Sequence, residues 1–199
     1  MITPPWRTDM SEFPVFYATT EGQTRRIAER LAALLHERGL DSRAIDVTSA
    51  EAQRVEWRAV RAVAVGASVH REKHQPAIEA FLRRYRDELN ARPAAFFSVS
   101  LRAAAPGAAD RDAARQVAVK LLTDTGWRPG QVTILAGRLA YTKYGWLMRW
   151  VMRRIARKAG LATDTSRDHE YTNWDEVARL ADDLAAELHR TRQTDRLAS

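Results

Sequence analysis

The sequence predicts an α/β protein in which helices cover both faces of a doubly wound, five-stranded parallel sheet. Five short segments rich in Val, Ala, Ile and Phe alternate with helical segments of about ten or more residues, which is the pattern of consecutive β–α–β units. The segment VRAVAVGA at residues 60–67 is apolar almost throughout, as strands buried on both faces are. We therefore expect right-handed crossovers between the parallel strands.

The individual elements follow from local periodicity. The expected strands are apolar segments bounded by turn-forming residues, and they lie at residues 13–18, 42–47, 60–67, 93–100 and 131–137. The expected helices have apolar residues three or four positions apart, and they begin at Gln23, Pro76, Asp110, Trp146 and Trp174. The segments between them are expected to be loops, including a polar turn at residues 68–74.

Local signals mark several helix ends. Gly39 is placed to form a left-handed C-cap, and Pro76 suits a first helical turn. Asp110 is expected to cap its helix, and Asn173 with Glu176 is expected to form a capping box. The apolar stripe that we expect the last helix to bury consists of Val177, Leu180, Leu184 and Leu188.

Length and composition indicate one globular domain. The 199 residues suffice for a single core, and we expect a loose leader at residues 1–12, a domain at 13–191 and a tail at 192–199. The chain has no cysteine, and its five His residues lack metal-ligand spacing, so no metal site is expected. No signal peptide and no apolar run of about 18 residues is present, which predicts a cytoplasmic protein.

The segment at residues 15–24, VFYATTEGQT, has the pattern of an anion site. An apolar strand runs into a Thr- and Gly-containing turn, and a helical pattern follows at once. The free N–H groups and the dipole of a helix N-terminus favour negative charge. A phosphate site is one interpretation of this turn, and an ordinary well-capped helix is the other.

The position of this turn suggests the kind of ligand. Ligands of doubly wound sheets bind beyond the carboxyl ends of the strands at the switch point, where loops 19–24, 68–73 and 98–105 are expected to converge. The second and third loops have small and apolar residues that can flank a flat ring. Neither a G-x-G-x-x-G nor a G-x-x-x-x-G-K motif is present. A mononucleotide with a planar head therefore fits better than a dinucleotide.

Longer motifs carry a family resemblance. Residues 15–24, followed by Ala28 and Leu31, match the flavodoxin signature V-F-Y-x-T-x-x-G-x-T. Further motifs occur in order: GASV at 66–69, AFFSVSL at 95–101, WRP at 127–129, AGRLAY at 136–141, TDT at 163–165 and YTNW at 171–174. Over roughly residues 14–188, the chain resembles the menaquinone-dependent protoporphyrinogen IX dehydrogenase family.

The resemblance implies a flavodoxin-like fold and a function in haem biosynthesis. Members bind FMN, oxidise protoporphyrinogen IX to protoporphyrin IX and pass electrons to a membrane quinone, here menaquinone or ubiquinone. The flavin-binding residues that it implies are Thr19, Thr20, Glu21, Gly22, Gln23, Thr24, Ser68, Val69, Ser98, Val99, Ser100 and Leu101. Two of these residues depart from the family pattern, because Glu21 and Ser100 stand where Asp and Asn are expected. The sequence leaves the oligomeric state open, and a homo-oligomer is one of the possibilities.

The surplus segment at residues 138–172, between the last strand and the last helix, is a basic amphipathic insertion. Residues 126–163 contain eight Lys and Arg and no acid, which is a charge of +8. Because the whole chain has a net charge of +7, the remaining residues together carry −1. From Trp146 onward, apolar residues share one helix face and Arg residues the other, which is typical of helices at a membrane surface. The candidate substrate or membrane contacts are Tyr141, Trp146, Arg149, Trp150, Arg153 and Arg157. The alternative is a helix that packs on the protein with solvated arginines.

Other functions follow less directly from the residues. His70 and Arg71, in the expected third loop, are candidate catalytic residues because porphyrinogen oxidation requires a proton acceptor, although they can equally be ordinary polar surface. The leading prediction is an FMN enzyme attached peripherally to the inner face of the cell membrane. The alternatives are a flavodoxin-type electron carrier, another FMN quinone reductase, or a flavin-free module that binds a membrane or partner. No nucleic-acid recognition motif is present.

Overall fold

The computed structural model describes the backbone of residues 12–198 and the side chains of residues 12–190. Within them, five parallel strands form a sheet of order β2-β1-β3-β5-β6, and the strand order reverses between β1 and β3. The expected leader lies outside the described residues apart from Glu12. The parallel strands are β1 (Val15–Ala18), β2 (Ala44–Asp46), β3 (Val63–His70), β5 (Ala94–Ser100) and β6 (Gln131–Ala136).

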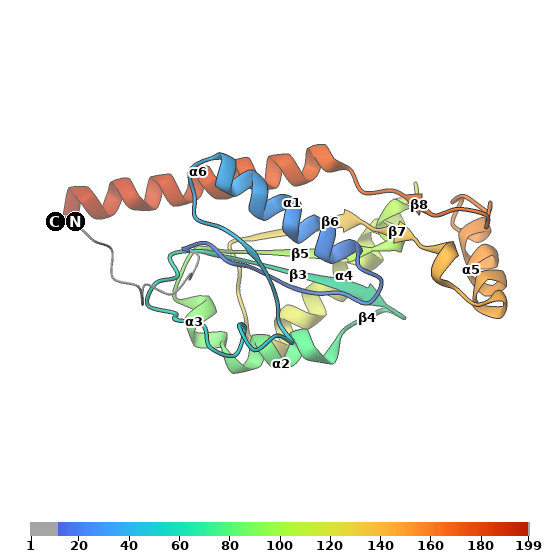
Figure 1. Cartoon of the computed structure of the whole chain (residues 1–199), viewed down its shortest axis with the longest axis horizontal. Coiled ribbons are helices and arrows are strands. Elements are labelled where there is room, and N and C mark those ends of the chain that lie inside the picture. The colour runs from blue at the N-terminus through green and yellow to red at the C-terminus, as the bar shows by residue number, and fades with distance from the viewer. Residues whose placement is uncertain (1–11, 199) are drawn as a thin grey trace.

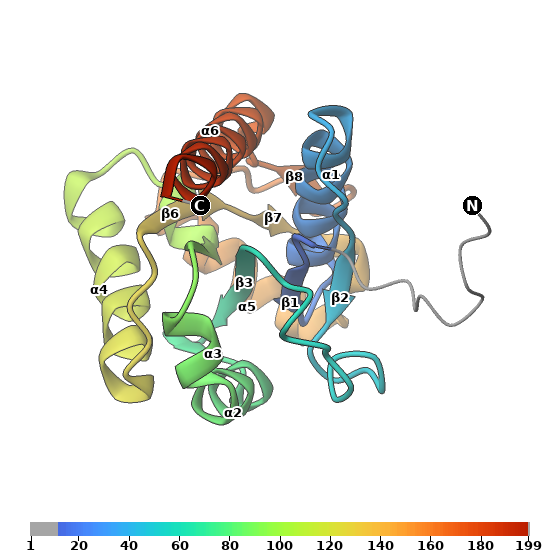
Figure 2. The same ribbon diagram turned by 90° about the vertical axis from the view of Figure 1, so that its left-hand side faces the viewer.

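Helices cover both faces of this sheet, as Figures 1 and 2 show. Helices α1 (Gln23–Glu37) and α6 (Trp174–Ala198) lie side by side on one face, and their apolar stripes form a core with Val15 and Phe97. The other face carries α2 (Pro76–Arg84), α3 (Arg86–Asn90) and α4 (Ala108–Thr125). The predicted doubly wound fold is therefore confirmed.

The centre of the sheet is packed tightly enough to require a glycine. Gly66 on β3 is the Cα partner of Phe97 on β5. A Cβ built on Gly66 would lie 2.0 Å from the Phe97 ring. The ring therefore occupies the space that any larger residue at position 66 would need, which explains the glycine in the middle of a strand.

The insertion forms a small unit of its own beyond the carboxyl ends of the strands (Figure 1). It contains β7 (Arg138–Leu139), the 3₁₀ turn η2 (Tyr141–Lys143), α5 (Trp146–Lys158) and β8 (His169–Glu170). Strands β7 and β8 pair antiparallel and close the base of the insertion. Helix α5 begins at Trp146, as predicted.

Several expected boundaries were wrong. The strands expected from residues 13, 42 and 60 begin at Val15, Ala44 and Val63. Strand β3 continues to His70 and turns into β4 (Lys73–His74), so the expected polar turn is a β-hairpin. The helix from Pro76 stops at Arg84, and a second short helix follows. The N-cap of helix α4 is Gly107, three residues before the expected cap Asp110, and the helix begins at Ala108. Helix α6 continues to Ala198, because residues 191–198 contain no Gly or Pro to end it.

Other local predictions were confirmed. Gly39 has a φ of +77°, and the four apolar residues expected on the inner face of α6 are all buried. The Asn173 side chain accepts a hydrogen bond from Asp175 N–H, the capping half of the expected capping box.

Candidate functional site

The turn between β1 and α1 is an open anion cradle. Gly22, with φ +94°, is the N-cap of α1, and its N–H donates to Thr19 Oγ1 at 2.9 Å. No side chain of residues 12–190 caps the first turn of α1, and this turn contains no acid. Thr24 is fully buried, and its hydroxyl has no hydrogen-bond partner among these residues. Free N–H groups and an unpaired buried hydroxyl thus meet at a helix N-terminus.

Three segments converge at this turn, as expected for a switch point. The side-chain amide of Gln75 donates to Thr20 Oγ1 at 3.2 Å and also to Ser68 Oγ. Ser68 is the Cα partner of Val99, which places the end of β3 beside the end of β5. Gln75 was not among the expected site residues, because nothing in its local sequence distinguishes it from any residue before a helix.

Several expected flavin-binding side chains already have protein partners. Ser98 lies inside β5, is fully buried and has its hydroxyl 3.0 Å from His74 Nε2. Ser100 caps η1 (Leu101–Ala104) by accepting from Arg102 N–H. The Gln23 side chain donates to Glu170 and Thr172. These three residues can therefore contact a ligand mainly through their backbone, whereas Thr24 has a free side-chain donor.

The β3–β4 hairpin presents His70 and Arg71 at the surface beside these segments. Arg71 and Glu72 form its turn with φ values of 50° and 61°, a left-handed conformation that L-residues seldom adopt. Arg102 pairs with Glu72 at 2.5 Å and ties the turn to η1. Neighbouring His74 points inward, where burial lowers its pKa to about 4. His74 is therefore neutral near pH 7 and packs against Phe96.

The base of the insertion contacts the turn at residues 19–24. Tyr144 donates its hydroxyl proton to Glu21 Oε1 at 2.7 Å, and Lys143 Nζ donates to the Glu21 carbonyl at 2.7 Å. Burial first, and then the hydrogen bond to Glu21, raise the pKa of Tyr144. Arg138 also reaches the Glu21 carbonyl at 3.5 Å. The sequence did not predict these contacts, because they join residues more than a hundred positions apart.

Further bonds hold the insertion together. Asp168 accepts from the N–H and hydroxyl of Thr142 at 2.9 and 2.8 Å and lies 3.6 Å from Arg138. Burial raises the pKa of Asp168, but the Thr142 hydrogen bonds and the nearby cations lower it by more. Tyr141 is fully buried, and its hydroxyl donates to the Ala162 carbonyl. Tyr141 therefore packs inside the insertion and has no surface with which to contact a membrane.

Helix α5 leaves most of its apolar side uncovered. Ala156 is fully buried and Met152 packs near Tyr141, so one narrow side of the helix contacts the protein. Among residues 12–190, six large apolar side chains are exposed, and five of them belong to α5: Trp146, Leu147, Met148, Trp150 and Ile155. Trp146 is 82% exposed and Trp150 is 59% exposed. Arg153 and Arg157 are exposed, whereas Arg149 donates to the Tyr144 carbonyl at 3.2 Å.

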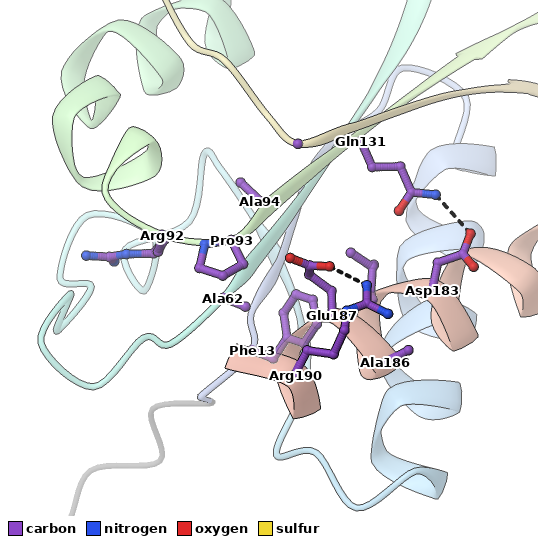
Figure 3. Close-up of a pocket in the computed structure, with 12 residues that line it drawn as sticks. Phe13, Ala62, Arg92, Pro93, Ala94, Gln131, Asp183, Ala186, Glu187 and Arg190 are labelled. Carbon is purple, nitrogen blue, oxygen red and sulfur yellow. Dashed lines mark hydrogen bonds and ion pairs between the residues drawn. The ribbon is translucent and has the colours of Figure 1, made fainter. Parts of the chain in front are cut away.

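A hollow lies at the opposite end of the sheet. Its volume is about 470 Å³, and it is lined by the amino ends of strands and by α6, where Asp183 and Glu187 lie (Figure 3). Gln131 bonds Asp183 across part of the opening. Its lining holds Asp183 and Glu187 together with Arg92 and Arg190, so its charges balance, and it includes no residue of the turn at residues 19–24. The hollow is therefore not the predicted phosphate site.

The turn at residues 19–24 fits the expected FMN. A phosphate in the cradle would meet the first-turn N–H groups of α1 and the unpaired Thr24 hydroxyl. The ends of β3 and β5 lie on the sheet next to it, where a ring system attached to that phosphate would extend. Within residues 12–198, no helix is both long and apolar enough to cross a membrane.

Comparisons with known proteins agree with this geometry. Residues 14–166 match the flavodoxin domain family. A protoporphyrinogen IX dehydrogenase [quinone] from Escherichia coli K12 is 33% identical over 171 residues, which cover 86% of this chain and 93% of that protein. A protein of the same name from Leishmania major is 30% identical over 175 residues, covering 86% of this chain and 74% of that protein.

A solved structure supports the fold alone. A flavodoxin from the domain Archaea superposes with a TM-score of 0.51 at 18% identity, over 89% of this chain and 98% of that one. The family model covers most of the chain, and the relatives above 30% identity are covered over most of their length. The chain therefore belongs to the protoporphyrinogen IX dehydrogenase (quinone) family of flavodoxin-domain proteins.

Proposed function

We propose that this chain is an FMN-dependent enzyme that oxidises protoporphyrinogen IX to protoporphyrin IX and passes the electrons to a quinone. The observation that carries the proposal is the open cradle at α1, with its unpaired Thr24 hydroxyl, in a chain 33% identical to relatives of that name. Bound FMN supplies the redox chemistry by accepting hydride equivalents and returning electrons. The side chains of the protein position the cofactor and the substrate and accept protons.

The residues around the cradle take distinct roles in this proposal. The first turn of α1, with Thr19, Thr20 and Thr24, binds the phosphate, and the ends of β3 and β5 flank the ring. Oxidation also releases protons from the porphyrinogen, and in this proposal His70, which is exposed on the hairpin, accepts one of them. In the same proposal, Arg71 at the hairpin turn pairs with a substrate carboxylate.

We further propose that α5 attaches the protein to the anionic inner face of the cell membrane. Support comes from the exposed apolar side chains of α5, from its two exposed tryptophans and from the cations Arg153, Arg154, Arg157 and Lys158 around them. An apolar face of this kind inserts shallowly at the headgroup level, and nearby Lys and Arg contribute about 1 kcal/mol each on an anionic surface. A quinone dissolved in the membrane would then be within reach of the flavin site.

An assay of purified protein loaded with FMN tests the enzyme. Protoporphyrinogen IX and a menaquinone analogue are supplied together, and porphyrin fluorescence is followed against the same mixture without protein. We expect fluorescence to rise faster with the loaded protein and to depend on the quinone. A rate equal to the non-enzymatic rate would refute the proposed activity.

Vesicle co-sedimentation tests the membrane proposal. The double variant Trp146→Ala/Trp150→Ala should bind anionic phosphatidylglycerol vesicles at least about tenfold more weakly, because two large aromatic side chains no longer insert. Val119→Ala removes the exposed apolar side chain of α4 and is the matched control, which should bind like the wild type. Equal binding of the double variant and the wild type would contradict the proposal.

A further inference from the structure

We propose that Lys143, contributed by the insertion, is a cofactor-binding residue that balances the charge of Glu21 and the FMN phosphate at the N-terminus of α1. The inference rests on the proposed FMN function and adds a second task for the insertion. The insertion carries α5, and it also contributes Lys143 to the proposed phosphate site. The site is therefore built from two parts of the chain that are more than a hundred residues apart.

The position of the Lys143 ammonium group supports this role. Its Nζ donates to the Glu21 carbonyl at 2.7 Å and would lie 3.8 Å from a Cβ built on Gly22. Gly22 directly precedes the first turn of α1, whose N–H groups form the anion cradle. One of the three ammonium donors binds the turn itself, so the positive charge is held beside the cradle.

The charges around the turn show why a cation is required there. Glu21 places a carboxylate in the phosphate turn, held by the Tyr144 hydroxyl at 2.7 Å. Asp168 and Arg138 form an ion pair at 3.6 Å, and Glu170 pairs with Arg26 at 3.0 Å. Arg138 and Lys143 both donate to the Glu21 carbonyl, but Arg138 also pairs with Asp168, so the closer Lys143 ammonium is the charge best placed to offset the Glu21 side chain and a bound phosphate. Without it, a flavin phosphate of charge close to −2 would face an uncompensated carboxylate.

The role of Lys143 can be separated from a role in folding. Tyr144, Thr142 and the β7–β8 pair hold the insertion in place through other atoms, and Lys143 is exposed. A neutral residue at position 143 should therefore leave the fold unchanged while the local charge changes. Lys158, an exposed cation at the far end of α5, has the same charge without contact to the turn and provides a matched control.

The test compares FMN with riboflavin, which lacks the phosphate. Flavin fluorescence quenching gives both dissociation constants for the wild type, Lys143→Gln and Lys158→Gln. We expect Lys143→Gln to weaken FMN binding about fivefold at low salt, the upper end for an exposed charge pair, and to leave riboflavin binding unchanged. Lys158→Gln should bind both flavins like the wild type. Added salt should reduce the difference between Lys143→Gln and the wild type, because mobile ions screen exposed charges.

A charge-balance role also predicts rescue. Glu21→Gln in the Lys143→Gln background should restore FMN affinity, because it removes the carboxylate that Lys143 offsets. Unchanged FMN affinity of Lys143→Gln, or equal weakening of FMN and riboflavin, would overturn the inference. A wild-type protein that binds neither flavin would instead overturn the proposed function itself.

Discussion

Helices α5 and α6 have the same amphipathic pattern and different surroundings. The apolar side of α6 is covered by α1 and the sheet, and Val177, Leu180 and Leu188 are almost inaccessible. The apolar side of α5 is largely open, with Leu147 and Ile155 about half exposed. Figure 1 shows that α6 lies along the sheet, whereas α5 lies beyond its end. Periodicity alone therefore distinguishes a helix from a loop but not a core helix from a docking helix.

The largest expected effect is a difference in stability between a core variant on α6 and a surface variant on α5. Leu180→Ala on α6 should lower the free energy of unfolding by about 2–5 kcal/mol, because it opens a cavity in a closed core. Leu147→Ala on α5 should change it by less than about 0.5 kcal/mol, because that side chain is already in water. Urea denaturation followed by circular dichroism measures both values. Similar losses in the two variants would mean that α5 is part of the same core as α6.

Acid should lower the free energy of unfolding through the protonation of His74. Its folded pKa of about 4 lies below the ordinary value of 6.5, so the unfolded chain binds a proton in this range and the folded protein does not. His74 therefore makes the free energy of unfolding depend on pH. This free energy is highest above about pH 6.5 and falls as the pH decreases toward 4, by about 3 kcal/mol in total.

The variant His74→Asn isolates this contribution. It cannot titrate in this range, so its unfolding free energy should fall less between about pH 7 and pH 5 than that of the wild type. Urea titrations at both pH values give the comparison. Parallel pH dependences for the two proteins would exclude His74 as the source.

The smallest effect should appear at the open face of α5. Arg154→Gln should weaken binding to anionic vesicles about fivefold, since one Lys or Arg near such a surface contributes about 1 kcal/mol. Arg115→Gln removes an exposed cation from α4 and should bind as the wild type does. Equal losses in both variants would point to attraction by the net charge of the whole protein rather than to docking through α5.

Most of the sheet could be predicted because its signals are local. Strands such as residues 60–67 are apolar runs, and the turn at residues 19–24 has a long motif. Strand β4 could not be predicted, because Lys73 and His74 are polar and the hairpin turn is Arg71-Glu72 rather than an Asn-Gly pair. The burial of Tyr141, which was a candidate substrate or membrane contact, could not be predicted either, because it depends on packing within the insertion.

The candidate site was predicted in outline for the same reason. The motif predicts a phosphate site at the turn that holds Gly22 and Thr24, and the positive φ of Gly22 and the unpaired Thr24 hydroxyl are compatible with that prediction. The contacts of Lys143 and Tyr144 with Glu21 depend on how a distant segment folds back, and no local pattern encodes that. Sequence motifs thus predict the part of the proposed site that lies on one β–α unit, and they give no signal for contacts that cross between units.

The β7–β8 pair makes the insertion modular. Arg138 is the Cα partner of Glu170 and Leu139 that of His169, so the chain leaves and rejoins the body at one place. Doubling the length of a closed loop adds only about 0.6 kcal/mol of closure entropy. Segments of different length could therefore replace residues 145–167 while the sheet, its helices and the contacts of Lys143 and Tyr144 with Glu21 keep their geometry. The outer part of the insertion, which includes α5, is therefore less constrained by the body than its base is.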